Sequence, residues 1–151
     1  MIYETKEQND LLYVCSLIEF VGRATKNKNA DIVRAIGKEG LAWNLEFADV
    51  NHCLSFEEVG DETIERHAIE NGNFDLISIC KYNVPDYIDI GGVYRDLILD
   101  VQAEHGGEIV DIIFDVFTSF ISEEISDFNS SLFYENPSYI YHSYLAGELL
   151  D

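Results

Sequence analysis

Apolar residues recur at helical spacing over most of this chain. In residues 7–25, 89–105 and 109–128 they fall at steps of three and four, which puts them on one face of an α-helix. Shorter helices are expected at residues 29–37, at residues 41–53, and from Asn136 or Pro137 to Leu149. The pattern therefore predicts a mainly α fold with little or no strand, a bundle-like single domain of two helical halves.

Capping residues indicate where several helices begin. Asn29 is a suitable cap for the second helix, and Ser55 and Asp61 each precede early carboxylates, so two short helical pieces are expected there. In the last helix we expect Tyr141, Tyr144 and Leu145 to face inward, with Tyr141 and Tyr144 three positions apart.

The helical pattern is interrupted between residues 72 and 87. Asn71-Gly72-Asn73 is a turn signal, and Pro85 ends whatever precedes it. Any strand is expected within residues 74–84. We therefore divide the chain into an N-terminal helical half (1–71), an irregular connection (72–87) and an acidic C-terminal helical half (88–151), which together form one domain.

Charge is distributed very unevenly along the 151 residues. The formal net charge is −20, yet residues 1–38 carry a net +1. From Asp96 to the last residue there are twelve carboxylates and no lysine or arginine. A field of this sign repels nucleic acid and anionic substrates and favours a basic partner surface. Because 47% of the residues are hydrophobic, the chain is not an acidic disordered tail.

Cysteine usage and the first residues bear on the cellular compartment. The three cysteines are irregularly spaced, and Met1-Ile2-Tyr3-Glu4 does not resemble the start of a secretory signal. The most apolar stretch, residues 109–121, contains Asp111 and Asp115, so no membrane span is expected. We expect a cytoplasmic protein with reduced thiols.

Residues 17–50 have the look of a helix-turn-helix, with five cations close in sequence. They are Arg23, Lys26, Lys28, Arg34 and Lys38. A DNA-binding regulator needs such a cluster on one exposed face. The acidity of the remaining chain opposes the approach of DNA. A different role for the five cations is therefore more consistent with the negative electrostatic field of the protein. In that alternative the cluster meets the acidic half, either of the same chain or of a second copy in a homo-oligomer.

Residues for catalysis or metal binding are not arranged in any familiar pattern. No nucleophile elbow, phosphate-binding glycine loop or calcium loop is present, so we expect no enzyme, no catalytic residue and no cofactor. Structural zinc sites usually take two pairs of ligands at short spacing, which are absent, so no metal is expected. If zinc were bound, His52, Cys53 and Cys80 would be the first ligands to consider.

The region around Asn136-Pro137 combines carboxylates with aromatic rings, which is typical of a docking surface. The alternative is that these rings close the end of the core. We predict that a basic protein partner docks here, on six residues: Glu123, Glu124, Asp127, Phe133, Tyr134 and Glu135.

Two groups of segments carry a resemblance to known sequences. The first group comprises Tyr13–Arg23, Thr25–Lys28, Asp31–Val33 and Phe47–His52, and the second comprises Tyr82–Pro85 and Asp89–Ile98. Together they resemble a family of small uncharacterised helical proteins from gut bacteria, which is similar to a domain of unknown function encoded beside ADP-ribosyltransferase-like toxins. The resemblance implies a toxin–antitoxin or phage-defence setting and no active site.

These observations lead to a functional expectation with two alternatives. We expect a non-enzymatic acidic binding protein that docks a basic protein surface and contacts neither nucleic acid nor membrane directly. The first alternative is a nucleic-acid mimic, whose carboxylates inhibit a DNA-binding protein. The second is the regulator that uses residues 17–50.

Overall fold

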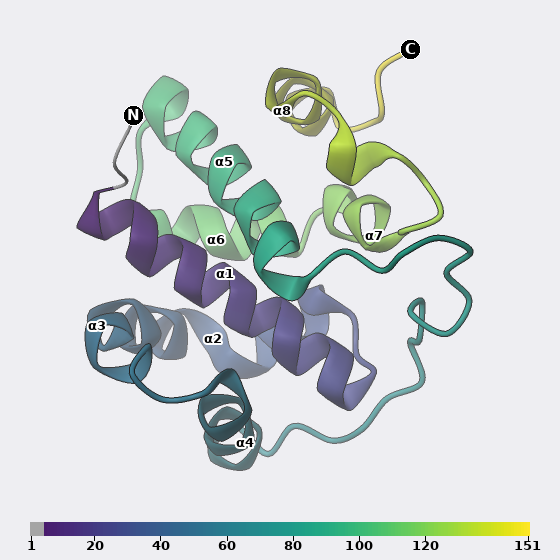
Figure 1. The fold of residues 1–151 in the computed structure, drawn as a ribbon. Helices are drawn as coiled ribbons and strands as arrows, with labels where there is room; N and C mark the ends of the chain where they lie inside the picture. The colour runs from purple at the N-terminus through teal and green to yellow at the C-terminus, as the bar shows by residue number, and fades with distance from the viewer. Residues whose placement is uncertain (1–4) are drawn as a thin grey trace.

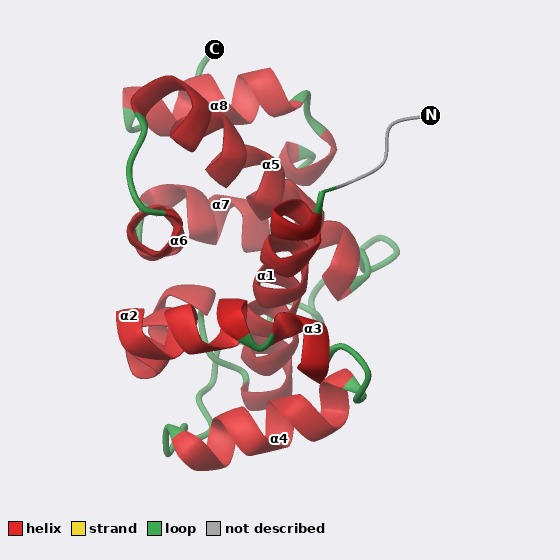
Figure 2. Cartoon of the chain, turned by 90° about the vertical axis from the view of Figure 1, so that its left-hand side faces the viewer, coloured by secondary structure: helices red, strands yellow, loops and turns green. Residues whose placement is uncertain are grey.

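The computed structural model describes residues 5–151, and all regular secondary structure in that range is helical (Figure 2). This confirms the predicted mainly α fold. In chain order the helices are α1 (Lys6–Thr25), α2 (Asn29–Glu46), α3 (Ala48–Asn51), α4 (Phe56–Arg66), α5 (Tyr87–His105), α6 (Ile109–Phe117), α7 (Phe120–Ser126), the 3₁₀ turn η1 (Leu132–Tyr134) and α8 (Pro137–Ala146).

Helix α1 runs through the middle of the fold (Figure 1). α5 packs along one side of it, and α2, α3 and α4 also contact it. α6 packs against both α2 and α5, while α8 packs on α5 and α7. Because α1 belongs to the N-terminal half and α5 to the C-terminal half, the two halves share one hydrophobic core.

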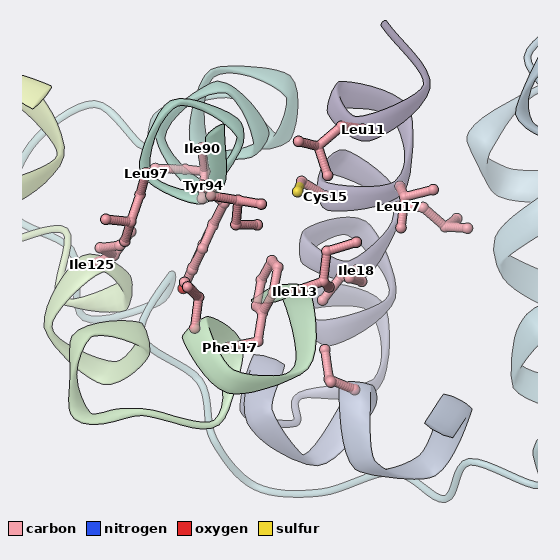
Figure 3. Close-up of a cluster of buried hydrophobic side chains, with 14 of the residues drawn as sticks. Leu11, Cys15, Leu17, Ile18, Ile90, Tyr94, Leu97, Ile113, Phe117 and Ile125 are labelled. Atoms are coloured by element: carbon pink, nitrogen blue, oxygen red, sulfur yellow. The ribbon is translucent and has the colours of Figure 1, made fainter. Parts of the chain in front are cut away.

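Buried side chains from both halves meet between α1, α5 and α6 (Figure 3). The ring of Tyr94 on α5 stacks on Phe117 of α6 with centroids 3.9 Å apart. The Tyr94 hydroxyl lies 3.0 Å from Ser122 Oγ on α7. Burial, reinforced by the charge of Glu19, raises the pKa of Tyr94. Tyr94 therefore stays neutral and ties α5 to the two helices that follow it.

The prediction of a single helix over residues 109–128 is wrong, because the chain forms two helices there. α6 ends at Phe117 and α7 begins at Phe120. Ser119 caps α7: its Oγ accepts a hydrogen bond from the Ile121 N–H and donates one to the Val116 carbonyl. Since this hydroxyl satisfies backbone groups on both sides of the break, the chain can turn without losing its buried apolar face.

The helix break expected at Gly37 is present: Gly37 has the non-helical angles φ 72° and ψ 168°, so α2 consists of two helical stretches joined at a kink, and the second stretch continues to Glu46. The start of α2 differs from expectation. Asn29 is not the cap. Lys28 holds that position, while the buried Asn29 side chain donates to Glu19 Oε1 at 2.7 Å. The need to satisfy a buried carboxylate thus outweighs capping.

One helix, α4, replaces the two short pieces expected after Ser55 and Asp61. Ser55 does cap it, with Oγ accepting from the Glu58 N–H at 3.0 Å. Asp61 does not begin a second helix but lies within α4. The helix continues past Asp61 because Val59 and Thr63, one on each side of it in the sequence, are both buried on the inner face of α4.

The connection between α4 and α5 (residues 67–86) is irregular, and no strand forms within the described residues, including 74–84. It follows the end of α1 through backbone hydrogen bonds, from the Gly72 N–H to the Thr25 carbonyl and from the Phe74 N–H to the Lys26 carbonyl, both 2.8 Å. These two hydrogen bonds join the connection to the turn at the end of α1. They are too few to form a β-ladder.

The last helix ends earlier than expected, at Ala146, where Gly147 adopts a left-handed conformation. Tyr141 is buried and Tyr144 half-buried, as expected. Leu145 does not face inward, since 47% of it is exposed.

Candidate functional site

The six residues predicted for partner binding lie at the α7–η1 end of the molecule. Glu123 and Glu124 are on α7, and Asp127 follows it directly. The Glu123 carboxylate lies 2.5 Å from the Lys28 ammonium, so part of this acidic group is engaged within the chain. Asp127 Oδ1 accepts from the Asn129 N–H, which supports the turn that leads into η1.

The aromatic members of the prediction border a wide groove, here called the aromatic groove. Its volume is about 720 Å³. Tyr134 on η1 is 80% exposed, and Tyr82 of the connection is 70% exposed. The ring centroids of Phe133 and Tyr134 are 4.2 Å apart. The groove is lined by Lys81, Tyr82, Asn83, Phe128, Asn129, Ser130, Ser131, Phe133 and Tyr134. Its lining contains one cation and no carboxylate.

Residues 81–83 belong to this groove, although the sequence offered no reason to connect them with residues 128–134. The amide of Asn129 holds the two segments together. Its Nδ2 donates to the Ile79 carbonyl at 3.2 Å, and its Oδ1 accepts from the Lys81 N–H at 2.7 Å. A side-chain amide thus bonds two backbone groups of the turn at residues 77–81, and Tyr82 lines the same groove as η1.

A second, smaller hollow adjoins the groove at Phe133, which lines both. This acidic hollow has a volume of about 110 Å³ and is lined by Val93, Asp96, Leu97, Phe133, Glu135, Pro137 and Ile140. The structure therefore places Glu135 with Asp96, a residue outside the predicted set. Charge differs across Phe133, with Lys81 on one side and two carboxylates on the other.

Three carboxylates extend from the acidic hollow along one face of α5, at positions 96, 100 and 104. We call them the acidic row. Residues four apart on a helix lie about 6 Å apart along its axis, close enough to repel. Burial, then the charges of Asp96 and Glu104, raise the pKa of Asp100 above its ordinary value of 3.8. Arg95 pairs with Asp96 at 3.2 Å.

The basic segment of the N-terminal half does not present a free basic face. Each of its five cations forms an ion pair with a carboxylate of the same chain: Arg23–Glu19, Lys26–Asp75, Lys28–Glu123, Arg34–Asp31 and Lys38–Asp111. Two of these pairs, made by Lys28 and Lys38, reach the acidic C-terminal half. The basic segment therefore meets the acidic half within the chain.

Glu19 forms the most buried of these ion pairs. Its Oε2 accepts from Arg23 Nε and its Oε1 from Asn29 Nδ2, both at 2.7 Å. Arg23 also donates to the Pro85 carbonyl at 2.8 Å and lies over the Phe128 ring. Since both Glu19 oxygens are occupied, this network joins α1, α2 and the connection and leaves no oxygen free for a ligand.

The side chains considered for metal or nucleophilic chemistry are scattered. Cys80 Sγ lies 3.3 Å from the Tyr82 carbonyl, whereas His52 and Cys53 follow α3. Cys15 is buried in the core, which raises the pKa of its thiol. Within residues 5–151 no three His, Cys, Asp or Glu side chains gather as metal ligands. In the same range, no helix has the length and apolar character that a bilayer span requires. Residues Met1 to Glu4, from which we expect no secretory signal, lie outside the described residues.

Comparison with known protein families, curated proteins and solved structures gives no match.

Proposed function

We propose that this protein is a non-enzymatic binding protein that docks a basic segment of a protein partner across the aromatic groove and the acidic hollow. The observation that carries the proposal is the pair of adjoining hollows that share Phe133. One offers exposed aromatic rings and the other offers two carboxylates.

The charges around Phe133 suggest how the partner lies. An apolar or aromatic side chain of the partner fills the groove between Tyr82 and Tyr134, where large rings provide buried contact area. A lysine or arginine of the partner lies in the hollow beside Asp96 and Glu135. Lys81 disfavours the reverse orientation, because it would face the incoming cation.

The whole-molecule field supports a basic partner. Since the cations of the basic segment are already paired within the chain, they do not compensate the outward charge of the acidic row. Long-range attraction speeds encounter with a basic surface, whereas the aromatic contacts determine how long the complex lasts. The same pairing weighs against the DNA-binding regulator, which needs those cations free to contact phosphates.

A nucleic-acid mimic remains the second candidate because the acidic row repeats at a regular spacing on α5. A mimic relies on carboxylates with few exposed apolar groups, while Tyr82 and Tyr134 are among the most exposed large hydrophobic side chains of the described residues. We include a cytoplasmic location in the proposal. A toxin–antitoxin or phage-defence setting is proposed from the sequence resemblance alone.

Selection of peptides from a random displayed library on the wild-type protein tests the proposal. We expect enrichment of peptides that combine lysine or arginine with an aromatic or large aliphatic residue. Tyr134→Ser and Tyr82→Ser should each weaken an enriched peptide about tenfold, the loss of roughly 1.4 kcal/mol at an anchor residue. Leu145→Ser, which removes an exposed apolar side chain outside both hollows, is the matched control.

Kinetic measurements separate the two parts of the site. Glu135→Gln should slow association and reduce its dependence on salt, whereas Tyr134→Ser should mainly speed dissociation. Enrichment of neutral peptides that bind Tyr134→Ser as well as wild type would overturn the proposal. Enrichment of purely basic peptides that are insensitive to Tyr82 and Tyr134 would favour the mimic instead.

A further inference from the structure

A second face of the molecule also combines exposed apolar side chains with carboxylates. Phe47, Val50 and Leu54 surround the short helix α3, and all three are exposed, Val50 to 65%. Residues 47, 50 and 54 are spaced like the buried positions on one face of a helix. The chain turns at α3, however, so their side chains are exposed to solvent. Leu54 directly precedes Ser55, the cap of α4, so this apolar group lies against the start of α4.

The outer surface of α4 is the acidic part of this face. Five of its eleven residues are exposed carboxylates: Glu57, Glu58, Asp61, Glu62 and Glu65. Within the described chain none of them forms an ion pair. Arg66, the one cation of α4, lies over the Trp43 ring at 4.2 Å instead of bridging to them. We call the apolar group and these carboxylates together the α3–α4 face.

Helix stability does not explain this arrangement of charge. Glu57 and Glu58 lie in the first turn, where the helix dipole favours them. Glu65 lies in the last turn, where the dipole opposes negative charge. In addition, residues 57, 61 and 65 form one row of like charges at four-residue steps, and residues 58 and 62 form a second, so each row repels itself. A partner that neutralises the rows would relieve this repulsion.

The α3–α4 face is remote from the aromatic groove. In Figure 1, α3 lies at the lower left and α4 at the bottom, whereas α7, which directly precedes groove residues 128–134, lies at the right. A partner on one face would therefore leave the other accessible.

We propose that the α3–α4 face is a second docking surface, which binds a basic amphipathic helix of a protein partner. Two adjacent rows of carboxylates, with members about 6 Å apart along the helix axis, match a helix that presents cations at positions i, i+1, i+4 and i+5. Apolar side chains at one end of that helix cover Val50 and Leu54. Charge sets the approach, and the apolar end fixes the register.

The probe is a synthetic helical peptide with lysines at those positions and two leucines at one end, titrated into ¹⁵N-labelled full-length protein. We expect chemical-shift changes concentrated at residues 47–66. Asp61→Asn with Glu65→Gln should weaken binding about twofold to thirtyfold, as expected for two lost exposed ion pairs. The same variant should raise the melting temperature, because it removes like-charge repulsion.

Matched variants separate this surface from general acidity and from the groove. Glu148→Gln with Asp151→Asn removes the same charge from exposed positions after α8 and should leave peptide binding unchanged. Tyr134→Ser should also leave it unchanged, even if it abolishes binding at the aromatic groove. Val50→Ser with Leu54→Ser should weaken the leucine-bearing peptide and not a version whose leucines are replaced by serine.

Three results would overturn the inference. Shift changes spread over all acidic helices would indicate non-specific attraction. Equal weakening by the variants at residues 148 and 151 would give the same conclusion. Equal affinity of the leucine and serine peptides would show that the exposed apolar group takes no part.

Discussion

Gly91 of α5 lies directly against Ser16 of α1. A β carbon at position 91 would come within 2.9 Å of the Ser16 backbone nitrogen and still closer to its Oγ. The two central helices therefore touch through backbone, and this close approach brings Tyr94 and Leu97 into the core beside α1.

Replacing Gly91 with alanine should destabilise the protein, because α1 and α5 must move apart to accept the methyl group. We expect a loss of about 1–3 kcal/mol in the free energy of unfolding, measured by urea denaturation followed by circular dichroism. Gly92→Ala is the control. Its added β carbon would meet only Arg95 Nη2 at 3.9 Å, so the helix-favouring methyl should be neutral or stabilising by up to about 1 kcal/mol. Equal losses at both positions would contradict the close helix contact.

Removing the positive partner of Glu19 should be more damaging than removing both charges. Arg23→Met keeps much of the apolar stem and leaves a buried carboxylate uncompensated, so we expect a loss of about 3–5 kcal/mol. The double variant Glu19→Gln, Arg23→Met should be less destabilised than Arg23→Met alone. A double-mutant cycle by chemical denaturation measures the difference. Strict additivity of the two single effects would show that the ion pair contributes nothing.

Asp100 should make stability depend on pH in an unusual direction. Because its pKa is raised on folding, the folded state holds this proton more tightly than the unfolded state. The charged form is thus unfavourable at neutral pH, and that penalty disappears as pH falls through the raised pKa. We expect Asp100→Asn to be more stable than wild type at pH 7, with the advantage shrinking in acid. Thermal melts from pH 7 to pH 4 measure it, and a constant difference would exclude the linkage.

The break between α6 and α7 should depend on the cap at Ser119. Ser119→Ala removes the acceptor for the Ile121 N–H, and we expect a loss of about 1 kcal/mol in the free energy of unfolding. Ser138→Ala on the exposed start of α8 is the control, where a change within about 0.5 kcal/mol is expected. If Ser119→Ala is neutral, apolar packing alone sets the break.

The helical segments were largely predictable, whereas their ends were less so. Residues 7–25 and 89–105 were placed within two residues of α1 and α5, because apolar periodicity is a local property of the chain. The division at Ser119 was missed, since the apolar spacing continues through it and the two faces turn toward different neighbours. Asn29 was expected to cap α2, but its side chain bonds Glu19. Helical spacing could not reveal this, because Glu19 lies ten residues earlier on another helix.

For the candidate site, the sequence pointed to the aromatic turn at residues 133–135 because rings and carboxylates lie close together there. It did not point to Tyr82 or Asp96, which reach that site only through the packing of the connection and α5. It also did not show that Phe47, Val50 and Leu54 are exposed, because helical spacing alone does not tell which face a neighbouring helix will cover.

The sequence by itself determined the helical class and the net charge of −20, because backbone periodicity and charge count do not depend on distant contacts. Only the tertiary structure decided how that charge is used. It paired Lys28 with Glu123 and Lys38 with Asp111 across the two halves, and among residues 5–151 it left the carboxylates of α4 without ion-pair partners. Ion pairs of this kind join residues more than seventy positions apart, so their formation depends on how the helices pack around α1.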